Sequence, residues 1–171
     1  MAIDPGISGG LAIMVDGQPL TQHVMPLATA AAVGFVSQKS AKKKVVNLSQ
    51  IKTIVVTYRI ELVLIEGQWR DGMCNQCKLE ALMQIEGIPY QIIHPRSWQT
   101  IIPPDIKQSF KDTKQRAIET CHRLCLPVQA NGSDRGYHDG LADAWCIAAY
   151  YTKSQTDNGG KSKKNGKRKS K

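Results

Sequence analysis

Four acidic residues of this sequence occur where their side chains could gather into one site. Asp4 follows a short apolar segment, Glu66 ends a longer one, and Asp139 and Asp143 are four residues apart. Carboxylates held close together repel one another unless cations lie between them, and an all-oxygen ligand set favours Mg²⁺ or Mn²⁺ over zinc. Two such ions can activate a water molecule and stabilise the leaving oxygen of a phosphodiester. The four acids therefore predict metal-dependent hydrolysis.

Each acid also has a purely structural explanation. Asp4 stands before Pro5-Gly6 and could only form a turn, and Glu66 could belong to a buried salt bridge. Asp139 could cap a helix, a role that is compatible with binding a metal. Asp143, beside alanines and a tryptophan, would be poorly placed in a core unless it faced a site. The joint pattern favours the metal site.

The elements that must position these acids are an antiparallel meander followed by alternating helices and strands. Residues 1–3, 11–15 and 20–25 are predicted strands, and Asp16-Gly17 is a strong hairpin signal between the second and the third. Residues 26–46 are expected to be irregular or weakly helical. A helix with Ile51, Ile54, Val55 and Tyr58 on its apolar face follows, and Asn47 or Ser49 could cap it.

The second half of the chain alternates more regularly. Residues 62–66 and 90–93 are expected to be buried strands, residues 77–86 a helix, and residues 95–100 a turn or short helix begun by proline. Thr113 could cap a helix with Ala117, Ile118, Cys121, Leu124 and Cys125 on its apolar face, and a last helix runs from about Asp139 to Tyr151. We therefore predict an α/β fold with helices on both faces of a mixed sheet, and with Asp4 and Glu66 at one edge if their strands are neighbours.

The composition indicates one domain with a basic tail. The chain has 171 residues with 42% hydrophobic content, and it contains no apolar run of the length that a membrane helix needs. The net charge is +9, and residues 154–171 supply +6 of it. This segment is almost free of apolar residues, so we expect a domain over 1–153 and a disordered tail over 154–171 that binds polyanions. A solubilising tail and a nuclear address are the alternatives.

The sequence resembles the RuvC-like Holliday junction resolvases of the RNase H-like nuclease superfamily. The matching segments are Ala2–Gly10, Leu64–Trp69, Lys114 and His138–Ala144. Together they extend over nearly the whole domain. The resemblance implies an RNase H-like fold, two Mg²⁺ or Mn²⁺ ions per active site, a homodimer, and paired symmetric nicks in a four-way DNA junction. It also implies a role in DNA recombination and repair.

Carried over by position, Asp4, Glu66 and Asp143 match the metal-binding acids of the family. Asp139 is preferred as the fourth ligand, with His138 as the alternate, because the segment is closer to the organellar branch than to the bacterial one. Lys114 matches a basic residue that stabilises charge at the scissile phosphate, although it could also be an exposed lysine of a first helical turn. A second family lysine is absent near residues 97–99.

The resemblance and the local chemistry also suggest residues that contact DNA. Trp69 matches an aromatic residue that stacks on bases at the junction centre, and its alternative is a tryptophan folded back on its own loop. Arg70 beside it suits a phosphate contact, and Arg96 could take the role of the absent lysine. A basic run that includes Lys42, Lys43 and Lys44 could touch the same partner.

Other hypotheses stay open at this point. A ribonuclease of the same superfamily that acts on RNA or on RNA/DNA hybrids fits the basic tail, and so does an inactive junction-binding protein. The five cysteines are expected to be free thiols, since an odd number without regular spacing does not form a disulfide framework, and the helical spacing of Cys121 and Cys125 favours core packing over a zinc site. The resemblance implies the cytoplasm or nucleoid of a prokaryote or of a phage-infected cell, with an organelle or a virus-associated compartment as alternatives. The first strand is short against the family, as expected of a truncated start.

Overall fold

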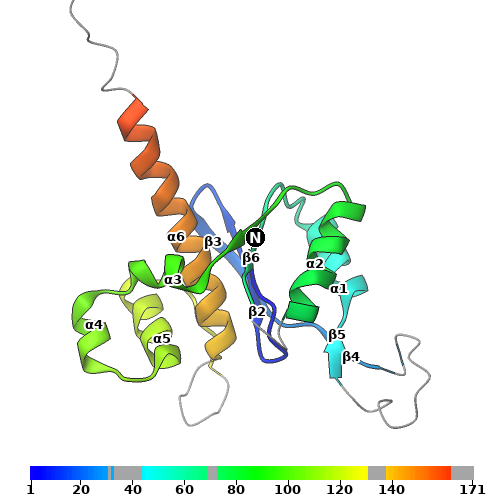
Figure 1. The fold of residues 1–171 in the computed structure, drawn as a ribbon, viewed down its shortest axis with the longest axis horizontal. Coiled ribbons are helices and arrows are strands. Elements are labelled where there is room, and N and C mark those ends of the chain that lie inside the picture. The colour runs from blue at the N-terminus through cyan, green and yellow to red at the C-terminus, as the bar shows by residue number, and fades with distance from the viewer. Residues whose placement is uncertain (31, 33–43, 69–72, 131–137, 163–171) are drawn as a thin grey trace, which may run out of the picture.

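A five-stranded mixed sheet forms the centre of the protein, and two layers of helices cover it (Figure 1). The structure is a computed structural model that describes residues 1–30, 32, 44–68, 73–130 and 138–162. The strand order is β3-β2-β1-β6-β7. This arrangement confirms the predicted α/β fold with helices on both faces of a mixed sheet.

The first three strands form the predicted antiparallel meander. They are β1 (Ala2–Asp4), β2 (Gly10–Val15) and β3 (Gln18–Val24). Asp16 and Gly17 connect β2 to β3 with φ angles of 50° and 76°. A two-residue turn with both φ angles positive has the twist that a tight hairpin needs, and Gly17 adopts this conformation without strain.

The two strands β6 (Val63–Glu66) and β7 (Tyr90–Ile93) continue the sheet in parallel. β1 pairs with β6 in parallel, with Ala2 opposite Leu64 and Ile3 opposite Ile65. The next residue of each strand is an acid, so Asp4 and Glu66 leave the sheet side by side. The prediction that these two strands are neighbours in the sheet is confirmed. Both carboxylates therefore lie at the carboxyl ends of parallel strands.

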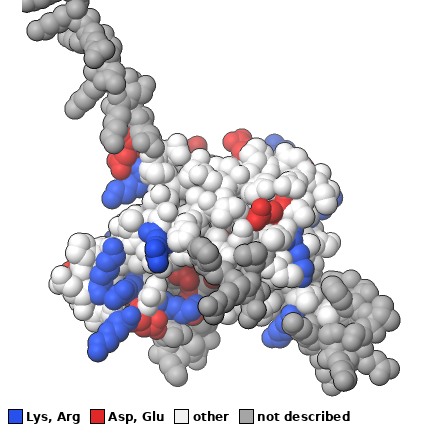
Figure 2. Space-filling view, in the orientation of Figure 1, with Lys and Arg blue, Asp and Glu red and all other residues white. Residues whose placement is uncertain are grey.

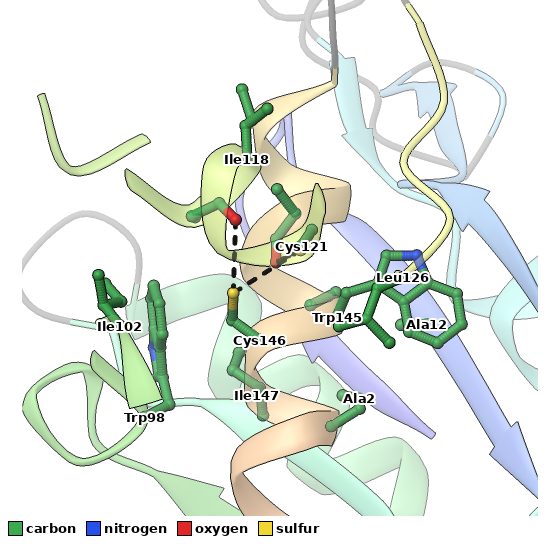
Figure 3. Packing of buried hydrophobic residues seen from close by; sticks show 14 of the residues in the cluster. Ala2, Ala12, Trp98, Ile102, Ile118, Cys121, Leu126, Trp145, Cys146 and Ile147 are labelled. Carbon is green, nitrogen blue, oxygen red and sulfur yellow. Dashed lines mark hydrogen bonds between the residues drawn. The ribbon is translucent and has the colours of Figure 1, made fainter. Parts of the chain in front are cut away.

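Alternate strand residues face the two helical layers. Ile3, Leu11 and Ile65 pack against α1 (Leu48–Thr57) and α2 (Met73–Ile85). Ala2, Ala12 and Leu64 face the other layer, which includes the buried residues labelled in Figure 3. That layer consists of α3 (Pro95–Trp98), the 3-10 helix η2 (Gln99–Ile101), α4 (Pro104–Ser109), α5 (Thr113–Arg123) and α6 (Asp139–Ser162).

Three details of the strands and of α2 differ from the expectation. Residues 26–46 were expected to be irregular or weakly helical, but β4 (Leu27–Thr29) and β5 (Lys44–Val46) pair as a small separate sheet. α2 begins at Met73, four residues before the expected start. β7 was expected to be buried, yet Gln91 and Ile92 are exposed because β7 is the edge strand of the sheet in the described part of the chain.

Helix ends account for most differences in the second half. Asp112 rather than Thr113 caps α5, since its carboxylate accepts the backbone N–H of Lys114. α5 ends at Arg123, and therefore Leu124 and Cys125 leave the predicted apolar face and are exposed. α4 was not predicted, because its six residues are too few to show helical periodicity. As expected, Asn47 caps α1.

The last helix is longer than expected. α6 continues to Ser162 instead of ending near Tyr151, so residues 154–162 are helical rather than disordered. No proline interrupts this stretch, and a helix that is already formed extends at little cost per residue. The hydroxyls of Thr152, Ser154 and Thr156 are satisfied by carbonyls of the preceding turn. Residues 163–171 of the expected tail lie outside the described residues.

None of the helices in the described part of the chain is long and apolar enough to cross a membrane. All five cysteines are free thiols, as expected, and Cys121 and Cys146 are the buried ones.

Candidate active site

Asp4 and Glu66 form the sheet half of the site. Both are buried, with 7% and 8% of their surface exposed. Asp4 Oδ1 accepts the backbone N–H of Gly6 at 3.0 Å, which folds the loop after β1 around the carboxylate. Glu66 accepts two side-chain hydrogen bonds, from Trp98 Nε1 at 2.8 Å and from Gln68 Nε2 at 3.1 Å.

Asp143 is brought to the same place by α6, which packs across β1 and β2. Only 9% of the residue is exposed, and the residues around it on the helix are buried. Its Oδ1 atom is buried and has no hydrogen-bond partner among the residues that the structure describes. A buried carboxylate oxygen without a donor is costly, so it indicates a site for a cation rather than a structural role.

Glycines set the distance between α6 and the loop after β1. Gly9 and Gly140 approach so closely that their backbones form an isolated β-bridge. A Cβ atom on Gly140 would overlap the carbonyl oxygen of Ser8, and one on Gly10 would lie 2.6 Å from Leu141 Cδ2. Because these positions carry no side chain, the first turn of α6 docks directly onto the loop that follows Asp4.

Asp139 stands at the start of α6 and pairs with Lys114. The Lys114 ammonium lies 3.0 Å from Asp139 Oδ2, across the gap between the first turns of α5 and α6. Lys114 is thus a member of the acidic cluster rather than an ordinary surface lysine. The neighbouring His138 has a buried Nδ1 atom without a partner among the described residues. Both Asp139 and its alternate His138 therefore lie at the site.

The charges of the cluster act on one another. Burial, followed by the nearby Asp4 carboxylate, raises the pKa of Glu66 to about 7. Burial also raises the pKa of Asp4, and it raises the pKa of Asp143 well above its usual range with help from Asp4 and Glu66. Burial alone would lower the pKa of Lys114, but the hydrogen bond to Asp139 and the surrounding carboxylates raise it. The carboxylates therefore form one electrostatic unit.

The donor set suits a hard divalent cation. In the part of the chain that the structure describes, no three His, Cys, Asp or Glu side chains already converge into a metal site. Asp4, Glu66 and Asp143 are nevertheless all buried, the Asp4 carboxylate raises the pKa of both Glu66 and Asp143, and Asp143 Oδ1 lacks a donor among the described residues. Carboxylate oxygens are the ligands that Mg²⁺ and Mn²⁺ prefer, so the chemistry of these residues fits a hard divalent cation.

The raised pKa of Glu66 predicts how stability depends on pH when metal is absent. Because the folded state binds this proton more tightly than the unfolded state, the stabilising contribution is complete below pH 4.5 and is lost as the pH rises through about 7. We expect a loss of about 3 kcal/mol over this range. Urea unfolding in EDTA at several pH values, compared between the wild type and Glu66→Gln, measures it. A constant difference between the two proteins would contradict the shift.

The structure describes only some of the residues that are predicted to contact DNA. Trp69, Arg70, Lys42 and Lys43 lie outside the described residues. Lys44 is exposed at the start of β5, in the small separate sheet. Arg96 is exposed on α3, and among the described residues it is Lys114 that forms a salt bridge with an acid of the cluster. The replacement of the absent family lysine by Arg96 stays a prediction.

The sequence interpretation missed other residues that surround the site. It assigned no role to Trp98 or Gln68, although both bind Glu66. It also passed over the basic residues of α4, α5 and the turn between them, where Figure 2 shows Lys and Arg side chains gathered. Apart from Lys114, which was predicted as a site residue, these residues are Lys107, Lys111, Arg116 and Arg123. The proximity of this basic surface to the cluster depends on the docking of α5 against α6, which the sequence does not reveal.

The fold is that of RuvC, with the expected RNase H-like architecture. A structure of Thermus thermophilus RuvC in complex with a Holliday junction substrate matches with a TM-score of 0.57 at 17% identity, over 90% of this chain and 92% of that one. A structure of Thermus thermophilus RuvC matches with a TM-score of 0.55 at 16% identity, over 91% and 94%. No family model matches the sequence, and no curated protein does. The likeness of residues 138–144 to the organellar branch stays a prediction.

Proposed function

We propose that this protein is a structure-selective DNA endonuclease that resolves four-way junctions by two-metal-ion hydrolysis. The observation that carries the proposal is the buried acidic cluster, in which Asp4, Glu66 and Asp143 meet at the carboxyl edge of a RuvC-like sheet. A cluster with raised pKa values in a fold shared with a nuclease supports an active site better than a structural salt-bridge network.

The residues divide between holding metal and handling charge. Asp4, Glu66 and Asp143 would hold Mg²⁺ or Mn²⁺ ions, and Asp139 or His138 would complete the ligand set. Bound metal would supply an activated water and charge stabilisation at the departing 3′-oxygen. Lys114 forms a salt bridge with Asp139, and its side chain is 42% exposed. Its ammonium can therefore reach an incoming phosphate. We assign it the stabilisation of charge at that phosphate.

The surface beside the site suits a polyanion. The basic residues of α4 and α5 adjoin the cluster through Lys114 (Figure 2). Arg123 is paired with Asp105, and Arg116 donates to backbone carbonyls, so Lys107 and Lys111 are the cations best placed for phosphate contacts. The RuvC structure with a bound Holliday junction supports branched DNA as the ligand. We assign Trp69 to base stacking and Arg70 to a phosphate contact at the junction.

Paired nicking requires a second active site. Two cuts that are related by the symmetry of a four-way junction need two sites related by a twofold axis, so we propose that the protein acts as a homodimer. Sedimentation of the full chain with and without a junction measures this state.

Cleavage of synthetic substrates tests the proposal directly. With Mg²⁺, we expect the protein to nick a four-way junction at least about tenfold faster than a linear duplex of the same sequence, because only the junction presents the branched shape. An RNA/DNA hybrid of matched length is the second control. Faster cleavage of the hybrid would favour a ribonuclease, and binding of the junction without cleavage would favour an inactive junction-binding protein.

A further inference from the structure

The Glu66 carboxylate is held from both sides by uncharged donors. The indole Nε1 of Trp98 donates to Oε1 at 2.8 Å, and the amide Nε2 of Gln68 donates to Oε2 at 3.1 Å. Each oxygen thus receives one hydrogen bond from the protein and keeps lone-pair capacity for a further partner. Neutral donors fix the orientation of the carboxylate without cancelling its charge, unlike the ammonium of Lys114 on Asp139.

Both donors are themselves fixed. Trp98 is only 1% exposed, and it ends the short helix α3, which follows β7 and begins with Pro95 (Figure 3). Its indole packs in the core layer formed with α6. The backbone N–H of Gln68 donates to Gln76 Oε1 at 2.7 Å, which ties the segment after β6 to α2. Trp98 belongs to the layer of α6, whereas Gln68 is tied to α2 on the other face of the sheet, and together their hydrogen bonds restrict rotation of the Glu66 side chain.

We propose that Trp98 and Gln68 are positioning residues that hold the Glu66 carboxylate in the orientation in which it binds a divalent metal, with Gln76 holding Gln68 in place. The inference rests on the proposed function, since it concerns the same site.

The molecule offers a matched control for Trp98. Trp145 is also fully buried in this layer (Figure 3), and its Nε1 donates to the side chain of Gln22 at 2.7 Å. Substitution of either tryptophan by phenylalanine removes an indole N–H and a comparable volume from the same core layer. The two variants are therefore expected to be destabilised to a similar extent. They differ in whether the lost hydrogen bond was made to Glu66.

The experiment measures Mn²⁺ affinity by calorimetry on the full chain without DNA, at pH 8, where the Glu66 carboxyl, with a pKa of about 7, is mostly ionised. We expect Trp98→Phe to weaken Mn²⁺ binding by about tenfold, which corresponds to about 1.4 kcal/mol. Trp145→Phe is expected to stay within about twofold of the wild type, because its hydrogen bond lies away from the acids. Junction cleavage by Trp98→Phe should recover at saturating Mg²⁺.

A second pair of variants covers the case in which Trp98→Phe does not fold. Gln68→Met keeps the length of the side chain and removes the donor to Glu66, whereas Gln84→Met removes an exposed donor to the Tyr90 hydroxyl. Only the first should weaken Mn²⁺ binding. If a variant and its control lose Mn²⁺ affinity equally, this inference is wrong. It is also wrong if Trp98→Phe and Gln68→Met both bind Mn²⁺ like the wild type. As long as the wild type cuts junctions, either result leaves the proposed function standing. A wild type that binds no Mn²⁺ would overturn the proposed function as well.

Discussion

Replacement of Glu66 with glutamine is expected to slow junction cleavage by roughly 10³-fold or more, which corresponds to about 4 kcal/mol of activation free energy. The substitution removes the charge of a metal ligand at the centre of the cluster and keeps its shape. The new amide oxygen can still accept the Trp98 N–H, and the Gln68 amide can rotate to offer its own oxygen. The fold and the DNA-binding surface should therefore be preserved.

Single-turnover cleavage of a labelled four-way junction measures the rate, and fluorescence anisotropy in Ca²⁺ measures binding. Glu119→Gln is the matched control, because Glu119 is a partly exposed acid of α5 whose partners are Gln115 and His122. It should cut and bind like the wild type. If Glu66→Gln cuts the junction at the wild-type rate, the acidic cluster is not the active site.

Replacement of Asp143 with asparagine is expected to have two effects of opposite sign. Without metal, the variant should be more stable than the wild type by about 1 kcal/mol or more, since it removes a buried carboxylate whose Oδ1 lacks a donor. With metal, it should lose both cleavage and the stabilisation that Mn²⁺ gives to the wild type. A residue with a purely structural role would lose stability under both conditions.

Thermal unfolding in EDTA and in Mn²⁺ measures both effects in one series. Asp157→Asn provides the control, because Asp157 is exposed on the same helix. It should change stability by less than about 0.5 kcal/mol in either buffer. An Asp143→Asn protein that is less stable in EDTA, or one that is still stabilised by Mn²⁺ to the wild-type extent, would contradict the assignment of Asp143 as a metal ligand.

The parts of the site that the sequence predicted are those with a local pattern. The apolar run before Glu66 indicated a buried parallel strand, and the turn after Asp4 marked the end of the first one. Both strand ends are where they were expected. The spacing of Asp139 and Asp143 predicted a shared helical face. In each case the residue type and its immediate neighbours determine the element, so the placement needed no knowledge of distant contacts.

The parts that the sequence did not predict depend on contacts between distant segments. Trp98 is an ordinary core tryptophan by its neighbours in the sequence, and the packing of α3 against α6 brings its N–H to Glu66, 32 residues away in the chain. Lys114 reaches Asp139 because α5 docks against α6. The pair β4 and β5 joins two short segments across a connection without clear periodicity. Propensity and spacing carry no information on such pairings.

The close contact between Gly9 and Gly140 has a consequence for the time at which the protein becomes active. During synthesis, Asp4 and Glu66 emerge early. Asp143 is made near the end, and it reaches them only when α6 docks on the loop that follows Asp4. A nascent or partly unfolded chain therefore lacks the complete acidic cluster. Under the proposed function, the ability to cut DNA is confined to molecules that have finished folding.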